Sequence, residues 1–320
     1  MFSFRRVLPS DRPALAAIAS KIWEGADYLP VVFDDWVADP TGEFTAVLLE
    51  GRVVGCGKLT FLTPTDAWFE GLRKDPSVRE KGLAAAVSAY YLSLLEGRED
   101  LTSIRFSTYF KNAASIKANE RTGFRRRAAF SWKSRTGTSA ELRAALSRGE
   151  NDARARVDTI VDEQAIFDFI ESTGYIESST GLILEGWRAY PYSRELFDSR
   201  YARKGLCRGV VERGVLRGLS AAVRDERFGH VYLKLVFLDA ADPETANALL
   251  DDLFLRGGEH EETRGVPRMA EGNVEIDWMV PPIGRVKEYC TARGFRSDEQ
   301  EDDLLVFELP PARLAERRVP

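Results

Sequence analysis

A glycine-containing loop between a predicted strand and a predicted helix carries the clearest chemical pattern in this sequence. Arg79 is followed by Gly82 and Ala84, so small residues stand where a backbone can approach a ligand closely. Several main-chain N–H groups and the positive end of the following helix would point to one place, as at many phosphate sites. The pattern suits a pyrophosphate. The alternative is an ordinary connection in which the glycine only begins the helix.

A second stretch begins 30 residues after Gly82 and follows an apolar strand; it reads Asn-Ala-Ala-Ser-Ile-Lys-Ala-Asn-Glu-Arg-Thr-Gly-Phe, residues 112–124. Together the two stretches resemble the GNAT superfamily of N-acetyltransferases. The loop is similar to that family's acetyl-CoA loop, and the second stretch is similar to its Asn-x-x-Ser-x-x-x-x-Glu-x-x-Gly-Phe helix. The resemblance covers residues 2–133.

The resemblance implies a binding site for acetyl-CoA as a co-substrate. Its pyrophosphate would be bound by main-chain N–H groups at Glu80, Lys81, Gly82, Leu83 and Ala84. The backbone of Leu72, Arg73 and Lys74 would pair with the pantetheine arm. Asn112 would contact the same arm, with Ser115 beside it.

Charged residues near this site depart from the family pattern or add to it. Lys74 stands where the family has an apolar residue, and Glu80 stands where it has a glycine. Glu80 must therefore point away from a bound pyrophosphate. Arg79 and the cluster Arg125–Arg127 would meet phosphate charges; a solvated strand edge is the alternative interpretation of the cluster.

Acetyl transfer to an amine needs a base, because an alkylamine is mostly protonated at neutral pH. The resemblance implies this role for Glu70, on a predicted central strand between Phe69 and Leu72, where burial would make the carboxylate a stronger base. The alternative is a strand-end carboxylate that faces solvent or pairs with Arg73. A strand N–H near Leu72 would polarise the thioester carbonyl.

The sequence offers no obvious acid that could protonate the departing thiolate. Many GNAT proteins have a tyrosine at the position of Asn119. Here Ser115, Tyr109 or water would have to protonate the thiolate, or it would leave unprotonated.

Hydrophobic periodicity and turn residues predict an alternation of strands and helices in the first half. Strands are expected at 2–7, 44–49, 53–61, 68–72, 104–108 and 127–132, and helices after Ser10-Asp11, at 82–95 and at 113–121. The predicted fold class is α/β, in the sense of an α+β mixed sheet. We expect two GNAT-like domains, each a mixed, mostly antiparallel sheet flanked by helices.

The second half repeats features of the first. Three matching features lie at similar offsets. The turn glycines Gly51 and Gly214 are 163 positions apart, Asp75-Pro76 and Asp242-Pro243 are 167 apart, and Gly123-Phe124 and Gly294-Phe295 are 171 apart. These offsets predict one duplicated unit. We expect a GNAT-like catalytic domain at 1–135, a linker at 136–152 and a second domain at 153–320. That second domain is expected to be degenerate, because Ala246 and Leu249 replace the loop residues Arg79 and Gly82.

Composition excludes several other classes. A net charge of −5 argues against nucleic-acid binding, and the longest mostly apolar run, 83–95, is too short to span a membrane. Three distant cysteines and two histidines predict neither a disulfide framework nor a metal site. A cytoplasmic monomer or homodimer is the expectation.

The sequence thus predicts a tandem GNAT N-acetyltransferase with one active site, which transfers acetyl from acetyl-CoA to a primary amine of a small molecule or peptide. A longer acyl donor is one alternative, and a non-catalytic acyl-CoA-binding or interaction protein is another. The sequence does not identify the acceptor; amino acids, antibiotic amines, polyamines and protein N-termini all remain open.

Overall fold

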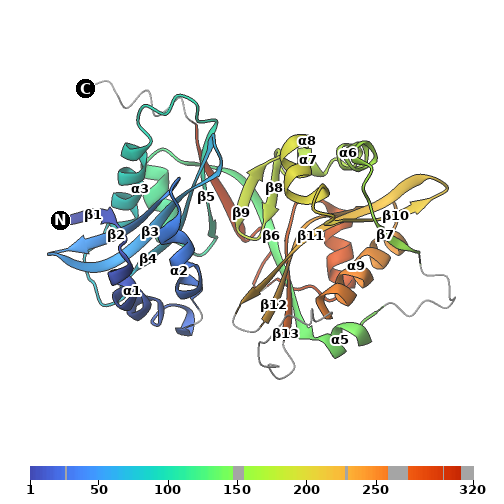
Figure 1. The fold of residues 1–320 in the computed structure, drawn as a ribbon, viewed down its shortest axis with the longest axis horizontal. Coiled ribbons are helices and arrows are strands. Elements are labelled where there is room, and N and C mark those ends of the chain that lie inside the picture. Colours follow the sequence, from blue (N-terminus) through green and yellow to red (C-terminus); the bar gives the residue numbers. More distant parts are fainter. Residues whose placement is uncertain (26, 147–154, 228–229, 259–272, 298, 311–320) are drawn as a thin grey trace. The chain divides into compact units, whose positions relative to one another are not determined.

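The structure, a computed structural model, describes residues 1–25, 27–146, 155–227, 230–258, 273–297 and 299–310. It consists of two compact units. Unit 1 holds Met1–Arg127 and the residues from Leu305 onward, and unit 2 holds Ala128–Leu304. The first and the last described residues therefore belong to unit 1, and the chain leaves this unit inside one strand and re-enters it at another (Figure 1).

Unit 1 contains a mixed sheet and helices on both of its faces. Its strands are β1 (Phe2–Arg6), β2 (Glu43–Leu49), β3 (Arg52–Thr63), β4 (Asp66–Lys74), β5 (Ser103–Tyr109), the start of β6 (Arg125–Thr138) and β14 (Leu304–Leu309). Its helices are α1 (Arg12–Ala19), α2 (Leu29–Ala38), α3 (Leu83–Leu94) and α4 (Ala113–Arg121), with short 3-10 turns η1 (Pro9–Asp11) and η2 (Trp23–Gly25).

The sheet of unit 1 is antiparallel from β1 to β4 and parallel from β4 to β5. The strand order is β1-β2-β3-β4-β5-β14, followed by β6. The predicted hairpin between β2 and β3 is present, and its turn residues Glu50 and Gly51 have φ of 52° and 79°. Helix α2, which the sequence analysis did not predict, precedes this hairpin.

Alternating side chains along the strands pack against different helices. Phe44 of β2 lies edge-on against Phe33 and Trp36 of α2, in a cluster that includes α1. Gly57 of β3 belongs to the opposite face, where a Cβ would lie 2.9 Å from the hydroxyl oxygen of Tyr91 in α3. Helices α1 and α2 therefore cover one face, and α3 covers the other.

The last described strand of the chain, β14, completes the sheet of unit 1. Its buried residues are Leu304, Leu305, Val306, Phe307 and Leu309. The Phe307 ring stacks on Phe106 of β5, with centroids 5.1 Å apart and planes 6° from parallel. Residues about 200 positions apart in the sequence thus share one core.

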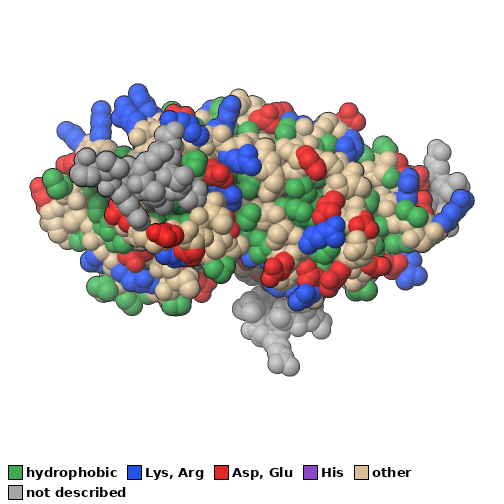
Figure 2. Space-filling model, turned by 90° about the horizontal axis from the view of Figure 1, so that it is seen from above, with side chains coloured by type: hydrophobic (Ala, Val, Ile, Leu, Met, Phe, Trp, Pro, Cys, Tyr) green, Lys and Arg blue, Asp and Glu red, His purple; other side chains and the backbone are tan. Residues whose placement is uncertain are grey.

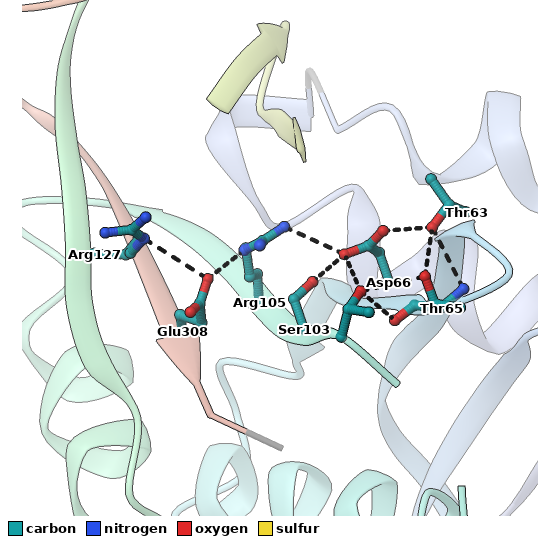
Figure 3. Close-up of polar contacts among 8 residues, drawn as sticks. Thr63, Thr65, Asp66, Ser103, Arg105, Arg127 and Glu308 are labelled. Atoms are coloured by element: carbon teal, nitrogen blue, oxygen red, sulfur yellow. Dashed lines mark hydrogen bonds and ion pairs between the residues drawn. The ribbon is translucent and has the colours of Figure 1, made fainter. Parts of the chain in front are cut away.

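A polar network joins β14 to the neighbouring strands (Figure 3). Asp66, buried at the start of β4, accepts a hydrogen bond from the Ser103 hydroxyl and lies 3.5 Å from Arg105 Nη1. Arg105 Nε donates to Glu308 Oε2 of β14 at 2.6 Å, and Arg127 Nε lies 4.0 Å from the same oxygen. Because the charged groups in this network are paired, the network can be buried and can fix the register of β14.

Unit 2 has a second mixed sheet. Its strands are the rest of β6, β7 (Val157–Thr159), β10 (Cys207–Glu212), β11 (Val215–Arg227), β12 (His230–Ala240) and β13 (Asn273–Val280), with a separate hairpin of β8 (Leu182–Glu185) and β9 (Arg188–Pro191). Its helices are α5 (Ser139–Ala144), α6 (Glu163–Ser172), α7 (Tyr175–Ser178), α8 (Arg194–Phe197), the π-helical turn η3 (Asp198–Ala202), α9 (Pro243–Gly258) and α10 (Gly284–Ala292). The order of the larger sheet is β6-β13-β12-β11-β10-β7.

The backbone of unit 2 repeats that of unit 1. Strands β10, β11 and β12 are antiparallel and β12 pairs parallel with β13, as β2, β3, β4 and β5 do in unit 1. The turn between β10 and β11 has φ of 51° and 79° at Arg213 and Gly214, almost the values of the β2–β3 turn. Both α4 and α10 are followed by a glycine with positive φ, Gly123 and Gly294.

The division predicted from the sequence, 1–135, 136–152 and 153–320, stays a prediction, and the structure describes part of its linker. Strand β6 continues to Thr138, and α5 then begins with a capping box between Thr138 and Glu141, so 136–144 is a strand end and a helix. Residues 147–152 of the predicted linker lie outside the described residues. The polar residues of this stretch include the cap of α5.

Side chains of both charges are exposed on the surface. Figure 2 shows acidic and basic side chains interspersed across the coloured part of the face that it presents.

Replacing Phe307 with alanine should lower the free energy of unfolding by about 3–5 kcal/mol, because the change leaves a cavity beside Phe106. Leu94→Ala, at an exposed position of α3, is the control and should change it by no more than about 0.5 kcal/mol. Chemical denaturation followed by circular dichroism measures both. Equal effects of the two substitutions would show that β14 does not stabilise the fold.

Candidate functional site

A β-bulge interrupts β4 beside Glu70. The register runs from Cys56 opposite Arg73 to Lys58 opposite Glu70, so two residues of β4, Gly71 and Leu72, face one residue of β3. Gly71 has φ of +66°, and a Cβ there would lie 2.4 Å from the Trp36 indole. Only glycine therefore fits this bulge without strain or displacement of α2.

Strands β4 and β5 pair only at their beginnings. The paired residues are Asp66 with Ser103, Ala67 with Ile104, and Trp68 with Arg105. Beyond Trp68 the strands, which the structure describes in full, share no further ladder pairs. The edge of β4 that carries Leu72, Arg73 and Lys74 therefore has main-chain groups that an extended ligand can bind as an additional strand would.

The loop after β4 leads to the N-terminus of α3. Asp75 accepts hydrogen bonds from the main-chain N–H and the hydroxyl of Ser77 at 3.0 and 2.8 Å, and from Lys21 Nζ at 3.2 Å. The Ser77 N–H, more than the other contacts, lowers the pKa of Asp75. This turn fixes the start of the loop, and Arg79, Glu80, Lys81 and Gly82 then follow as exposed residues.

Gly82 opens the N-terminus of α3. It has φ of +92°, and a Cβ placed on it would meet no atom within 4 Å. The first helical bond runs from Ala86 N to Gly82 O at 2.9 Å, so Leu83, Ala84 and Ala85 have no intrahelical acceptor for their N–H groups. The predicted pyrophosphate residues thus lie together at one exposed helix end.

The end of β4 and the start of α3 are close in space. Gly55 of β3 is paired with Lys74, and a Cβ on Gly55 would lie 3.2 Å from Leu83 Cδ1. The residues predicted for the pantetheine arm and for the pyrophosphate therefore form one continuous path in unit 1.

Glu70 is half-buried on β4. The Thr60 hydroxyl donates a hydrogen bond to Glu70 Oε1 at 2.6 Å. Opposite Glu70, the buried Lys58 bonds to Asp39 and to the Leu59 carbonyl oxygen; burial, more than any other cause, lowers the pKa of Lys58. The Thr60 bond therefore fixes the orientation of the Glu70 carboxylate.

Arg73 does not pair with Glu70. Its guanidinium binds Asp27 through Nε at 2.6 Å and Nη2 at 3.0 Å, and the two residues are 7% and 2% exposed. Burial, the largest single cause, lowers the pKa of Arg73, but the hydrogen bonds to Asp27 and the charges of neighbouring groups together raise it above its usual value. The rings of Trp23 and Tyr28 lie 4.5 and 5.0 Å from the guanidinium carbon.

Residues at the start of α4 form the other part of the predicted site. The exposed Asn112 caps α4, because its Oδ1 accepts from Ser115 N at 3.3 Å. Ser115 is half-buried on the first turn of the helix. Tyr109 ends β5, and its ring packs edge-on against Phe110 at 4.9 Å.

Asn119, which replaces the tyrosine of many GNAT proteins, is a buried bridge between two helices. It accepts a hydrogen bond from Ser88 of α3 at 2.6 Å and donates to the carbonyl oxygen of Ser115 at 2.9 Å. The sequence analysis treated this position only as a missing acid.

Thr60, Asp27 and Ser88 are polar partners of the site that the sequence analysis missed. Thr60 could have been found from the register of the β3–β4 hairpin, which places it near Glu70. Asp27 lies in the connection between α1 and α2, 46 residues before Arg73, and no local pattern links the two.

The corresponding helix of unit 2 begins differently. Asp242 precedes α9, and its Oδ1 accepts from Thr245 N at 2.8 Å, a bond that lowers its pKa. A carboxylate therefore occupies the helix end where unit 1 has an open glycine. An anion would meet like charge there.

Metal ligands, a cysteine nucleophile and membrane-spanning helices are three further features for which the described residues can be searched. No group of three or more His, Cys, Asp or Glu in the described part of the chain could hold a metal ion. Burial raises the pKa of the Cys56 thiol to about 12, which disfavours a thiolate nucleophile. Across the described residues, no helix is long and apolar enough to cross a membrane.

Residues 12–124 match the model of the acetyltransferase (GNAT) family. No curated protein matches the sequence significantly.

Solved structures resemble the whole chain. A GCN5-related N-acetyltransferase from Sphaerobacter thermophilus has a TM-score of 0.61 at 13% identity, over 97% of this chain and 96% of that one. A tandem GNAT protein from the clavulanic acid biosynthesis pathway has a TM-score of 0.58 at 17% identity, over 97% and 98%. A putative acetyltransferase from Thermoplasma acidophilum has a TM-score of 0.56 at 16% identity, over 96% of this chain and 99% of that one.

At these identities the similarity establishes the fold. The predicted fold class, a mixed α/β structure with two GNAT-like parts, is confirmed, and so is the resemblance to a tandem GNAT arrangement.

Asp27→Asn should lower the free energy of unfolding by about 3–5 kcal/mol, because it leaves the Arg73 charge buried without its anion. Asp34→Asn is the matched control: its bond to Arg12 is exposed and worth at most about 1 kcal/mol. Urea denaturation measures both. Similar small losses for the two variants would contradict a structural role for the buried pair.

Proposed function

We propose that unit 1 is an N-acetyltransferase that moves the acetyl group of acetyl-CoA to a primary amine of a small molecule or peptide. The unpaired edge of β4 that leads to the open N-terminus of α3 carries this proposal, because it offers main-chain groups for an amide-containing arm and then N–H donors for a pyrophosphate. The GNAT family match over residues 12–124 supports it.

The residues present suit this co-substrate. Leu72, Arg73 and Lys74 would pair with the pantetheine arm through their main chain, with Asn112 across from them. N–H groups of Glu80, Lys81, Gly82, Leu83 and Ala84 would hold the pyrophosphate. The exposed side chains of Arg79 and Lys81 would add positive charge, and the exposed Glu80 has room to point into solvent.

Acetyl-CoA supplies an activated acetyl group as its thioester. Glu70, held by Thr60, would take a proton from the amine directly or through water, so that the neutral amine can attack the carbonyl carbon. A main-chain N–H at the bulge, near Leu72, would stabilise the oxyanion that forms. Ser115, Tyr109 or water would protonate the departing sulfur, or it would leave as a thiolate.

Unit 2 is proposed to be a degenerate copy that binds no acetyl-CoA. Asp242 at the N-terminus of α9 would repel a pyrophosphate, and α9 begins without a glycine loop. The cytoplasmic location and the monomeric or homodimeric state stay predictions.

A non-catalytic acyl-CoA-binding or interaction protein is the second candidate. One observation favours it: the buried Asn119 takes the position of the tyrosine that many GNAT proteins have. Binding and turnover experiments separate the two candidates.

Excess acetyl-CoA should raise the melting temperature of the wild-type protein, since ligand at 100 times its Kd adds about 2.7 kcal/mol. Gly82→Glu should abolish this shift, because it places a carboxylate at the helix end. Gly51→Glu is the matched control, at another positive-φ glycine with open space around it, and should keep the shift. A shift that survives in Gly82→Glu would place the co-substrate elsewhere.

Glu70→Gln should lower kcat by about a hundredfold or more while leaving acetyl-CoA binding unchanged, because the amide cannot accept the proton. Release of free CoA, measured with polyamines, amino acids, amine antibiotics and peptide N-termini, gives kcat. Glu50→Gln, at an exposed turn, is the control. Acetyl-CoA binding without acceptor-dependent CoA release from the wild type would favour the non-catalytic candidate.

A further inference from the structure

A directional hydrogen-bond chain runs through unit 1 from Ser88 to Ser115. Asn119 is only 5% exposed, and both ends of its amide are used. Its Oδ1 accepts from the Ser88 hydroxyl at 2.6 Å. Its Nδ2 lies 2.9 Å from the carbonyl oxygen of Ser115 and 3.4 Å from the hydroxyl oxygen of the same residue.

The direction of this chain is fixed by the Ser115 carbonyl. A carbonyl oxygen can only accept, so the nitrogen of the Asn119 amide must face it. The amide oxygen must then face Ser88, whose hydroxyl has to donate. Reversing the amide would set two oxygens 2.9 Å apart in a buried place.

This direction determines what the Ser115 hydroxyl can do. Because Nδ2 of Asn119 is a donor, the Ser115 oxygen accepts in that contact and its own proton stays available. Within the described residues, no acceptor takes this proton. Ser115 lies on the first turn of α4, which follows β5, the strand that separates from β4 beyond Trp68.

We propose that Ser88 and Asn119 are positioning residues that keep the Ser115 hydroxyl as a hydrogen-bond donor for the sulfur of the co-substrate. This inference rests on the proposed function. Many GNAT proteins have a tyrosine at this position, and here Asn119 instead orients the Ser115 hydroxyl. Asn119 itself contacts no reacting atom.

The group transfer balances with these roles. The amine nitrogen forms a bond to the thioester carbonyl carbon, and the carbon–sulfur bond breaks with its electron pair going to sulfur. The proton that the amine loses goes to Glu70. The sulfur leaves as a thiolate, which Ser115 stabilises through its O–H without giving up the proton.

The experiment compares binding of CoA and S-methyl-CoA at pH 9.5 by calorimetry. A thiol with pKa near 8.5 is mostly ionised there, whereas the thioether carries no charge. Wild-type protein should bind CoA about tenfold more tightly than S-methyl-CoA, since a hydrogen bond to a charged acceptor is worth at least about 1.4 kcal/mol.

Asn119→Asp should remove this preference, because a carboxylate facing Ser115 takes its proton. Ser115→Ala should do the same, and the double variant should lose no more than either single one. Ser88→Ala keeps the amide direction that the Ser115 carbonyl sets but removes the hydroxyl that holds Asn119 Oδ1, so it should loosen Asn119 and give an intermediate ratio. This variant carries the test if Asn119→Asp fails to fold. Ser93→Ala, on the same helix as Ser88 but exposed, is the control and should keep the preference.

Each other outcome overturns the inference. Equal binding of the two ligands by wild type, or an unchanged preference in Asn119→Asp and Ser88→Ala, overturns it while the proposed function stands. Absence of binding of either ligand to wild type, together with no melting shift by acetyl-CoA, overturns both.

Discussion

The left-handed backbone at Gly71 is the constraint on which the arrangement of unit 1 depends. It lets β4 place two residues opposite one residue of β3, and the strand changes direction within the sheet. Pairing with β5 has already ended at Trp68, so the strand continues with an unoccupied edge. The indole of Trp36 fills the space that a side chain at Gly71 would need. The bulge in β4 and the close packing of α2 against it therefore depend on one residue without a side chain.

Much of unit 1 follows from local sequence. The β2–β3 hairpin and the helix that begins after Gly82 were predictable because turn residues and hydrophobic periodicity act over a few positions. The loop residues were predictable from a family pattern. The Asp27–Arg73 pair and the Ser88–Asn119 bond were not, because each joins side chains more than 30 positions apart and polar residues of these types are common on surfaces. The place of β14 was not predictable either: its apolar residues indicate a buried strand but not which sheet buries it.

The two units show how one backbone can keep its fold and differ in chemistry. Their hairpin turns have nearly the same dihedral angles, and their strands pair in the same order. The difference lies at the helix that follows the third antiparallel strand. Gly82 leaves the positive end of α3 open, whereas Asp242 satisfies the end of α9 with a carboxylate from its own chain. An internal cap stabilises a helix for the same electrostatic reason that makes an uncapped end attractive to anions.

The C-terminal position of β14 has a consequence for biosynthesis. Unit 1 begins at the first residue, but its sheet contains a strand that the ribosome produces only after Leu304. At about 5–20 residues per second, unit 2 takes roughly 10–40 s to translate. During that time the edge of β5 that pairs with β14 has no partner strand. A message truncated between Asn119 and this strand yields a chain with every residue of the candidate site and an incomplete sheet around it. Synthesis as far as Leu309 is thus a condition for completing the sheet around a site whose residues are made about 200 positions earlier.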